Sequence, residues 1–90
     1  MKAKVTKIDV KNNTVFIGID VHQRTWYVTI IYREFRKSFS ISSNAKILAN
    51  YLNKIFVNAQ YLAGYEAGCF GFAPYEKLVL EGISVKVLPH

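Results

Sequence analysis

Two acidic residues, Asp20 and Glu66, each follow a short and strongly apolar stretch of the chain, residues 16–19 and 62–65. Apolar runs of this length without alternation are typical of strands that are covered on both faces. If the two strands lie parallel and adjacent, both carboxylates emerge at the same edge of the sheet, where open α/β sheets generally bind ligands. We therefore expect them to face each other. The alternative is that Asp20 caps a turn and Glu66 begins the next loop.

Two carboxylates that converge in this way favour a divalent cation. They repel each other and are partly desolvated, so that either one of them is protonated or a cation lies between them. Mg²⁺ prefers such oxygen ligands and combines one or two carboxylates with phosphate oxygens and water. Asp20 and Glu66 are therefore candidate metal ligands at a site for phosphate chemistry.

Basic and aromatic residues near Asp20 suggest a second kind of contact. His22 could touch a phosphate or orient metal-bound water, although a loop histidine can equally be solvated. Aromatic residues between positions 26 and 32 lie among arginines, as in a platform on which bases stack, but aromatic residues of a hairpin also pack across strands. The candidate nucleic-acid-binding residues are His22, Arg24, Arg33, Arg36 and Lys37.

We expect strands to position Asp20 and the basic residues near it. Residues 14–20, 25–32 and 35–41 are β-prone, and only Arg33 and Glu34 separate the second run from the third. This is hairpin spacing without the usual Gly or Asn turn. The pattern predicts a three-stranded antiparallel meander with the first strand central in its sheet.

Helices and two further strands follow the meander. Apolar residues recur with a helical period over about residues 44–57, and a polar residue at positions 42–44 can cap the start of this helix. The sequence then predicts a buried strand at 60–66, a helix around 72–79 and a last strand at 83–88. The predicted order is β-β-β-α-β-α-β, an α/β fold with helices packed on a mixed sheet.

Charge and composition narrow the class of protein. Twelve Lys and Arg against six Asp and Glu give 90 residues a net charge of +6, which favours polyanionic partners. Residues 1–13 contain four lysines and one acid, and we interpret them as a basic arm or a loosely paired extension before one folding unit at 14–90. No stretch predicts a membrane span or a signal peptide, and the single Cys69 excludes an internal disulfide. We expect a cytoplasmic protein with no membrane partner.

Two segments resemble a known family. Phe16-Ile17-Gly18-Ile19-Asp20-Val21-His22 and Tyr65-Glu66-Ala67-Gly68-Cys69-Phe70-Gly71-Phe72 are similar to the first and second motifs of the DEDD-type insertion-sequence transposases. This RuvC-like group includes the Piv and MooV invertases and is usually named for insertion sequence one-hundred-ten. The resemblance covers about residues 14–90. The chain differs from the residues usual in the family at Gln23, Ala73-Pro74 and Glu76. These differences concern local contacts and not the resemblance as a whole.

The resemblance implies an RNase H-like fold and a catalytic role. Asp20 and Glu66 match the first two acids of the family's D-E-D-D tetrad, where they would hold Mg²⁺ or Mn²⁺ ions that polarise a phosphodiester and activate the attacking oxygen. The other two Asp normally follow the fifth strand in a Lys-x-Asp-x-x-Asp segment, which these 90 residues do not reach. We therefore expect the amino-terminal part of a catalytic domain, with a weakly bound metal or none, and inactive by itself.

The same resemblance implies partners. The whole protein would act as a homo-oligomer on the DNA ends of a mobile element and on target DNA, in the cytoplasm of a bacterium or archaeon. In some relatives a guide RNA made by the element takes part.

Two alternatives belong to other classes of protein. Sugar kinases and actin-like ATPases also open with an apolar strand and Gly-Ile-Asp, but they need a phosphate-binding turn where His22-Gln23-Arg24 stands here. A non-catalytic nucleic-acid-binding module would keep the fold and the basic surface without the metal. Metal binding at Asp20 and Glu66 separates this module from the transposase.

Overall fold

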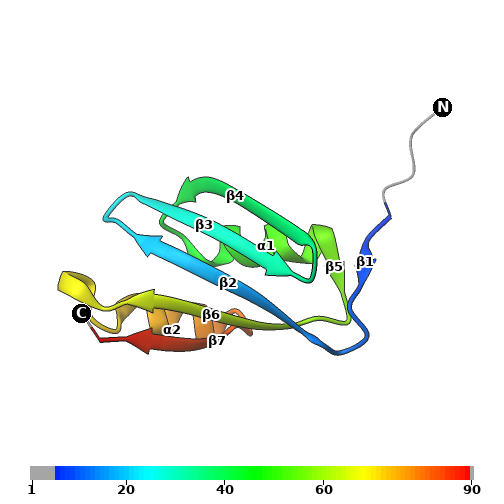
Figure 1. Cartoon of the computed structure of the whole chain (residues 1–90). Coiled ribbons are helices and arrows are strands. Elements are labelled where there is room, and N and C mark those ends of the chain that lie inside the picture. The colour runs from blue at the N-terminus through cyan, green and yellow to red at the C-terminus, as the bar shows by residue number, and fades with distance from the viewer. Residues whose placement is uncertain (1–5, 90) are drawn as a thin grey trace.

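A computed structural model describes residues 6–89, except for the side chain of Cys69. It is a mixed α/β structure in which the predicted order β-β-β-α-β-α-β is present, with two very short strands and one short 3₁₀ helix added. Figure 1 shows the longer strands β4, β3, β2, β6 and β7 side by side in one twisted sheet, and the two short strands β1 and β5 as a separate pair at one end of it.

The sheet has five strands in the order β4-β3-β2-β6-β7. Their bounds are Thr14–Val21 for β2, Thr25–Tyr32 for β3, Phe35–Ser42 for β4, Gln60–Glu66 for β6 and Ser84–Leu88 for β7. The β2-β3 and β3-β4 pairs are antiparallel, which confirms the predicted meander. The β2-β6 and β6-β7 pairs are parallel. The strands that carry Asp20 and Glu66 are therefore adjacent and run in the same direction, as the sequence predicts.

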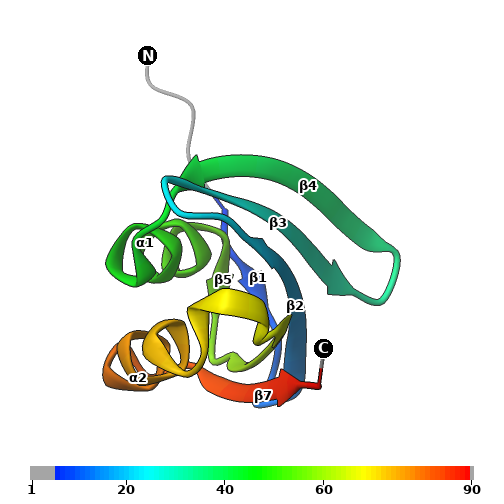
Figure 2. The ribbon, with the colours of Figure 1, turned by 90° about the vertical axis from the view of Figure 1, so that its left-hand side faces the viewer.

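Both α-helices lie on one face of this sheet (Figure 2). α1 spans Ala45–Ile55 and α2 spans Ala73–Leu80, while the 3₁₀ helix η1 spans Gly68–Phe70. The side chain of Asn44 caps α1 by accepting hydrogen bonds from the N–H groups of Lys46 and Ile47. Of the three polar residues at positions 42–44, Asn44 is thus the cap.

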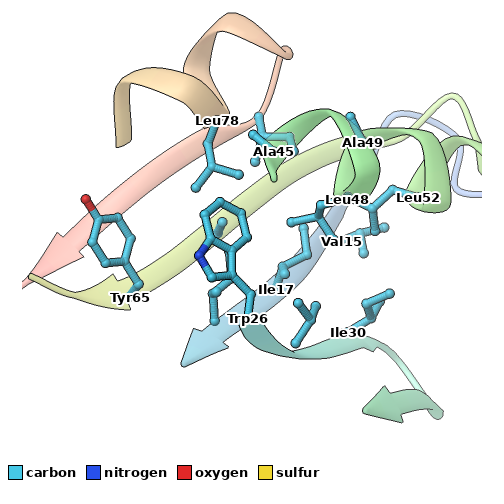
Figure 3. Close-up of a cluster of buried hydrophobic side chains, with 14 of the residues drawn as sticks. Val15, Ile17, Trp26, Ile30, Ala45, Leu48, Ala49, Leu52, Tyr65 and Leu78 are labelled. Atoms are coloured by element: carbon cyan, nitrogen blue, oxygen red, sulfur yellow. The ribbon is translucent and has the colours of Figure 1, made fainter. Parts of the chain in front are cut away.

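The core lies between the helices and the sheet (Figure 3). Alternate residues of β2 and β3 point into it, because successive side chains of a strand point to opposite faces. Leu48 and Leu52 of α1 and Leu78 of α2 are fully buried against them. The buried residues contributed by β2 and β3 are Val15, Ile17, Ile19, Trp26, Val28 and Ile30.

Part of the amino-terminal extension is joined to the fold. β1 (Ile8–Asp9) pairs in parallel with β5 (Phe56–Val57), which directly follows α1. Val10 is completely buried in the core. Residues 1–5, which contain two of the four lysines of the predicted basic arm, lie outside the described residues.

The second face of the sheet carries no helix of the described chain (Figure 2). Phe16 of β2 and Tyr27 of β3 are about half exposed on this open face, at 51% and 49%. Within residues 6–89 no helix is long and apolar enough to span a membrane.

Candidate functional site

Asp20 and Glu66 lie at the carboxyl ends of β2 and β6 and line one open pocket of about 710 Å³. The parallel register joins Gly18 to Gly64 as the last pair, so Asp20 and Glu66 are each two residues beyond it on the same side of their strands. Both residues are exposed. The sheet therefore brings the two predicted carboxylates to one pocket.

Two glycines form part of the wall of this pocket, next to the carboxylates. Gly18 and Gly64 face each other across the β2-β6 pair. A Cβ atom added at Gly18 would meet no atom within 4 Å, and one added at Gly64 would meet the Lys86 carbonyl oxygen at an ordinary 3.7 Å. The fold itself therefore does not require glycine at these two positions. Glycine inside a strand weakens it and often marks a place where a ligand approaches closely.

His22 lies beside Asp20. Its Nε2 atom is 3.3 Å from the Oδ2 atom of Asp20, and both side chains are mostly exposed, at 66% and 71%. The backbone N–H of His22 donates to the carbonyl of Thr25 across the β2-β3 turn, which keeps this histidine at the end of the hairpin. His22 therefore lines the pocket and lies next to one of the two carboxylates, while its predicted contact with a phosphate or with metal-bound water stays a prediction.

The loop after Glu66 forms the other wall. Gly68 and Phe70 of η1 line the pocket, together with Leu88 at the end of β7. Ala67 ties the loop to β7, because its N–H donates to the Leu88 carbonyl, and its own carbonyl accepts from the N–H groups of Phe70 and Gly71. Sequence reasoning missed Phe70 and Leu88 as pocket residues. Gly68 and Gly71, which flank Phe70 and both have positive φ, were the available signal for Phe70, whereas no signal in the sequence indicated Leu88.

The predicted basic residues separate into two groups. Arg24 lies in the turn between β2 and β3, at the end of the hairpin that carries Asp20. Arg33 lies in the turn at its other end, and Arg36 is paired with Ile31 in the adjacent part of β4. Lys37 is paired with the buried Ile30, and its Nζ lies 5.5 Å from the centre of the Tyr51 ring of α1. The structure thus brings His22 and Arg24 to the pocket end, and does not bring Arg33, Arg36 and Lys37 there.

The aromatic residues of the hairpin, Trp26, Tyr27 and Tyr32, are divided in the same way. Trp26 is buried in the core, and Tyr32 packs edge-on against Phe56. These two rings serve packing, as aromatic residues of a hairpin more often do. Tyr27, which pairs with Asp20 across the β2-β3 strands, is the ring of the three that stays half exposed.

The donor set limits what the pocket can do. Within the described part of the chain, no three His, Cys, Asp or Glu side chains are grouped closely enough to hold a metal ion. Two carboxylates are nevertheless enough for the mode in which Mg²⁺ keeps most of its water and is bound together with substrate phosphates. A cation held by Asp20 and Glu66 would therefore need further oxygen ligands from water or from a bound phosphate.

Comparison of the chain with protein-family models, with curated proteins and with solved structures gave no match.

Proposed function

We propose that this chain is the amino-terminal part of an RNase H-like catalytic domain that cleaves and joins DNA, as in a DEDD-type transposase or recombinase. The observation that carries the proposal is that Asp20 and Glu66 line one open pocket, at the carboxyl ends of adjacent parallel strands. These are the two residues that match the first two acids of the D-E-D-D tetrad.

The sheet supports the RNase H-like part of the proposal. A meander of three antiparallel strands is followed by two strands that lie parallel to its first strand, in the order β4-β3-β2-β6-β7. β2 is the central strand of this order, with β3 as its neighbour on one side and β6 as its neighbour on the other. The carboxyl end of β2 therefore lies between the antiparallel and the parallel part of the sheet. Ligands of open α/β sheets bind where the strand order changes direction.

The chemistry of the pocket supports phosphoryl transfer. Asp20 and Glu66 would hold Mg²⁺ or Mn²⁺, which would supply Lewis-acid polarisation of a phosphodiester and activation of the attacking oxygen. The bare backbone of Gly18 and Gly64 leaves room for a sugar-phosphate chain beside the carboxylates. His22 and Arg24, at the same end of the hairpin, would bind phosphate oxygens.

Mn²⁺ binding to the 90-residue chain tests the metal site. Bound Mn²⁺ is measured by the loss of the free-ion electron paramagnetic resonance signal, for the wild type, Asp20→Asn and Glu66→Gln. Each substitution keeps the size of the side chain and removes its charge, so we expect each to weaken Mn²⁺ binding by about tenfold or more. Asp9→Asn is the matched control, because Asp9 is an exposed carboxylate on β1, outside the pocket.

The results separate the proposal from its alternative. Weakening by both pocket variants and not by Asp9→Asn supports a shared metal site. Equal Mn²⁺ binding by the wild type and both pocket variants overturns the catalytic proposal. If the chain then still binds DNA, it is a non-catalytic nucleic-acid-binding module.

A further inference from the structure

Tyr65, the residue before Glu66, has a buried ring and a hydroxyl group with two hydrogen bonds. The residue is 2% exposed. In Figure 3 its ring stands at one end of the buried cluster, with the oxygen pointing away from the other labelled side chains. The hydroxyl donates to the Gly71 carbonyl over 2.8 Å and accepts from the Tyr75 N–H over 3.1 Å. A single side chain of β6 thus bonds the loop after Glu66 and the start of α2.

The bond to Tyr75 replaces a missing helix cap. Phe72 stands at the N-cap position of α2 and makes no side-chain cap hydrogen bond. Tyr75 is the third residue of the helix, and the N–H of that residue is one that an N-cap side chain normally accepts. The Tyr65 hydroxyl takes over this role from a different element of the fold.

The bond to Gly71 fixes the end of the pocket wall. Gly71 has a φ of 57° and closes the short loop that carries Gly68 and Phe70. The loop begins immediately after Glu66, and its first residue, Ala67, is bonded to Leu88. It is therefore held at its start by β7 and at its end by the hydroxyl of Tyr65. Without the hydroxyl, the Gly71 end would lose its link to β6.

We propose that Tyr65 is a positioning residue of the pocket: its hydroxyl holds the loop of residues 67–71 in place and so fixes the wall beside the Glu66 carboxylate. This inference rests on the proposed function, because a fixed wall serves the site only if Glu66 binds a cation or a phosphate. The ring of Tyr65 contributes to the core, whereas the hydroxyl contributes to the pocket.

Tyr61 offers a matched control on the same strand. Its side chain points to the helix face, as that of Tyr65 does, and its hydroxyl donates to the Oδ1 atom of Asn53 on α1 over 3.2 Å. It does not line the pocket that holds the carboxylates. Tyr65→Phe and Tyr61→Phe therefore each remove one bonded hydroxyl from β6, the first beside the pocket and the second away from it.

The experiment measures amide hydrogen exchange by NMR and Mn²⁺ binding for the wild type and both variants. We expect Tyr65→Phe to speed the exchange of the Phe70, Gly71 and Tyr75 amides by about tenfold or more, to shift the Glu66 backbone resonances, and to weaken Mn²⁺ binding several-fold. Core amides of β3 should keep their exchange rates. We expect Tyr61→Phe to leave the loop, the Glu66 resonances and Mn²⁺ binding unchanged.

Three outcomes decide the inference. Equal loop exchange and equal Mn²⁺ affinity in the two variants overturn the positioning role, even if both variants are less stable than the wild type. Faster loop exchange with unchanged Glu66 resonances and Mn²⁺ affinity also overturns it, since the hydroxyl would then order the loop without affecting the site. If Mn²⁺ binds equally to the wild type, Asp20→Asn and Glu66→Gln, the metal proposal fails, whereas the positioning role is then decided by loop exchange and the Glu66 resonances alone.

Discussion

Asp9 shows how a single exposed carboxylate can stabilise the amino-terminal strand pair. Its Oδ1 atom accepts from the Lys11 N–H over 2.9 Å and from the Nδ2 group of Asn58 over 3.3 Å. These hydrogen bonds, the one from Lys11 most of all, lower the pKa of Asp9 from its ordinary value of 3.8. Because Asn58 directly follows β5, the ionised carboxylate helps hold β1 against β5.

The pKa of Asp9 predicts a pH dependence of stability. A carboxyl group whose pKa is lower in the folded state stabilises the fold above its unfolded value, and this contribution is lost as the pH falls through the lowered pKa. We expect the difference in Tm between the wild type and Asp9→Asn to be full at pH 5–6 and to shrink below about pH 3.8. Thermal unfolding followed by circular dichroism measures it. A difference that is constant from pH 2 to pH 6 would contradict the assignment.

Asn44 is the second residue whose contribution can be measured alone. Its side chain satisfies two backbone N–H groups at the start of α1, which otherwise have no partner within the helix. Asn44→Ala should lower the free energy of unfolding by about 1 kcal/mol. Asn50→Ala is the control: Asn50 is exposed within α1, where Ala has the higher helix propensity, so that variant should not be destabilised. Urea unfolding of both variants gives the comparison.

At the scale of elements, the paired glycines of β2 and β6, Gly18 and Gly64, lower the stability of their strands without a reason in the packing of the fold. Glycine within a strand is less favourable than alanine by roughly 0.5–1 kcal/mol, and Gly18 has open space at its Cβ position. Gly18→Ala should therefore stabilise the chain by about that amount.

Gly82, which follows α2, has a φ of 83°, so Gly82→Ala should instead destabilise the chain by ~1 kcal/mol or more.

If the glycines serve a ligand, the more stable variant should bind less well. The added methyl group of Gly18→Ala would stand in the wall of the pocket that Asp20 and Glu66 share. Urea unfolding and Mn²⁺-dependent binding of a short DNA duplex are measured on the same preparations. Greater stability with unchanged DNA binding would show that the space beside Gly18 is not used.

The elements were predictable from the sequence where a pattern repeats over many residues. The helical period at 44–57 and the apolar strand at 60–66 predicted α1 and β6 closely, and two apolar strands that end in an acid predicted the pocket. β1 and β5 were not predictable, because two residues show no period and parallel pairing joins distant segments. The β3-β4 turn was predictable only from the two-residue gap between the two β-prone runs. Its residues gave no signal, because Arg33 takes a φ of 54° where Gly or Asn is usual.

The contacts within the site could not be predicted at all. No pattern in the sequence shows that His22 turns toward Asp20 or that Tyr65 caps a helix that begins eight residues further along the chain. These contacts depend on the path of loops, which side-chain periodicity does not describe. Likewise, alternation in β4 was too weak to show that Lys37 lies toward α1 and Tyr51.

At the scale of the whole molecule, the sheet has one face covered by helices and one open face (Figure 2). The pocket opens at the carboxyl end of the central strands, and the exposed ring of Tyr27 stands beside Asp20 in the neighbouring strand. The net charge of +6 makes the field around the chain attractive to polyanions. In the proposed role, the placement of individual cations would decide which of them contact the phosphates of a nucleic acid.

This placement predicts how DNA binding changes with salt. Each phosphate neutralised by a cation releases counterions, so the logarithm of the binding constant should fall linearly with the logarithm of the salt concentration, by about 0.9 per contact on duplex DNA. Arg24 is exposed at the pocket end, so Arg24→Gln should lower this slope by about one unit. Lys37→Gln removes the same charge from a side chain that lies over the Tyr51 ring, and should leave the slope nearly unchanged.

Fluorescence anisotropy of a labelled duplex, titrated at several salt concentrations, measures both slopes on the intact chain. The two variants have the same net charge, so a general effect of charge would change both slopes equally. A lower slope for Arg24→Gln alone would place phosphates at the end of the sheet that carries Asp20 and Glu66. Equal slopes would mean that the field of the whole molecule holds the DNA without a defined path to the pocket. No binding at low salt would exclude this surface as a nucleic-acid interface.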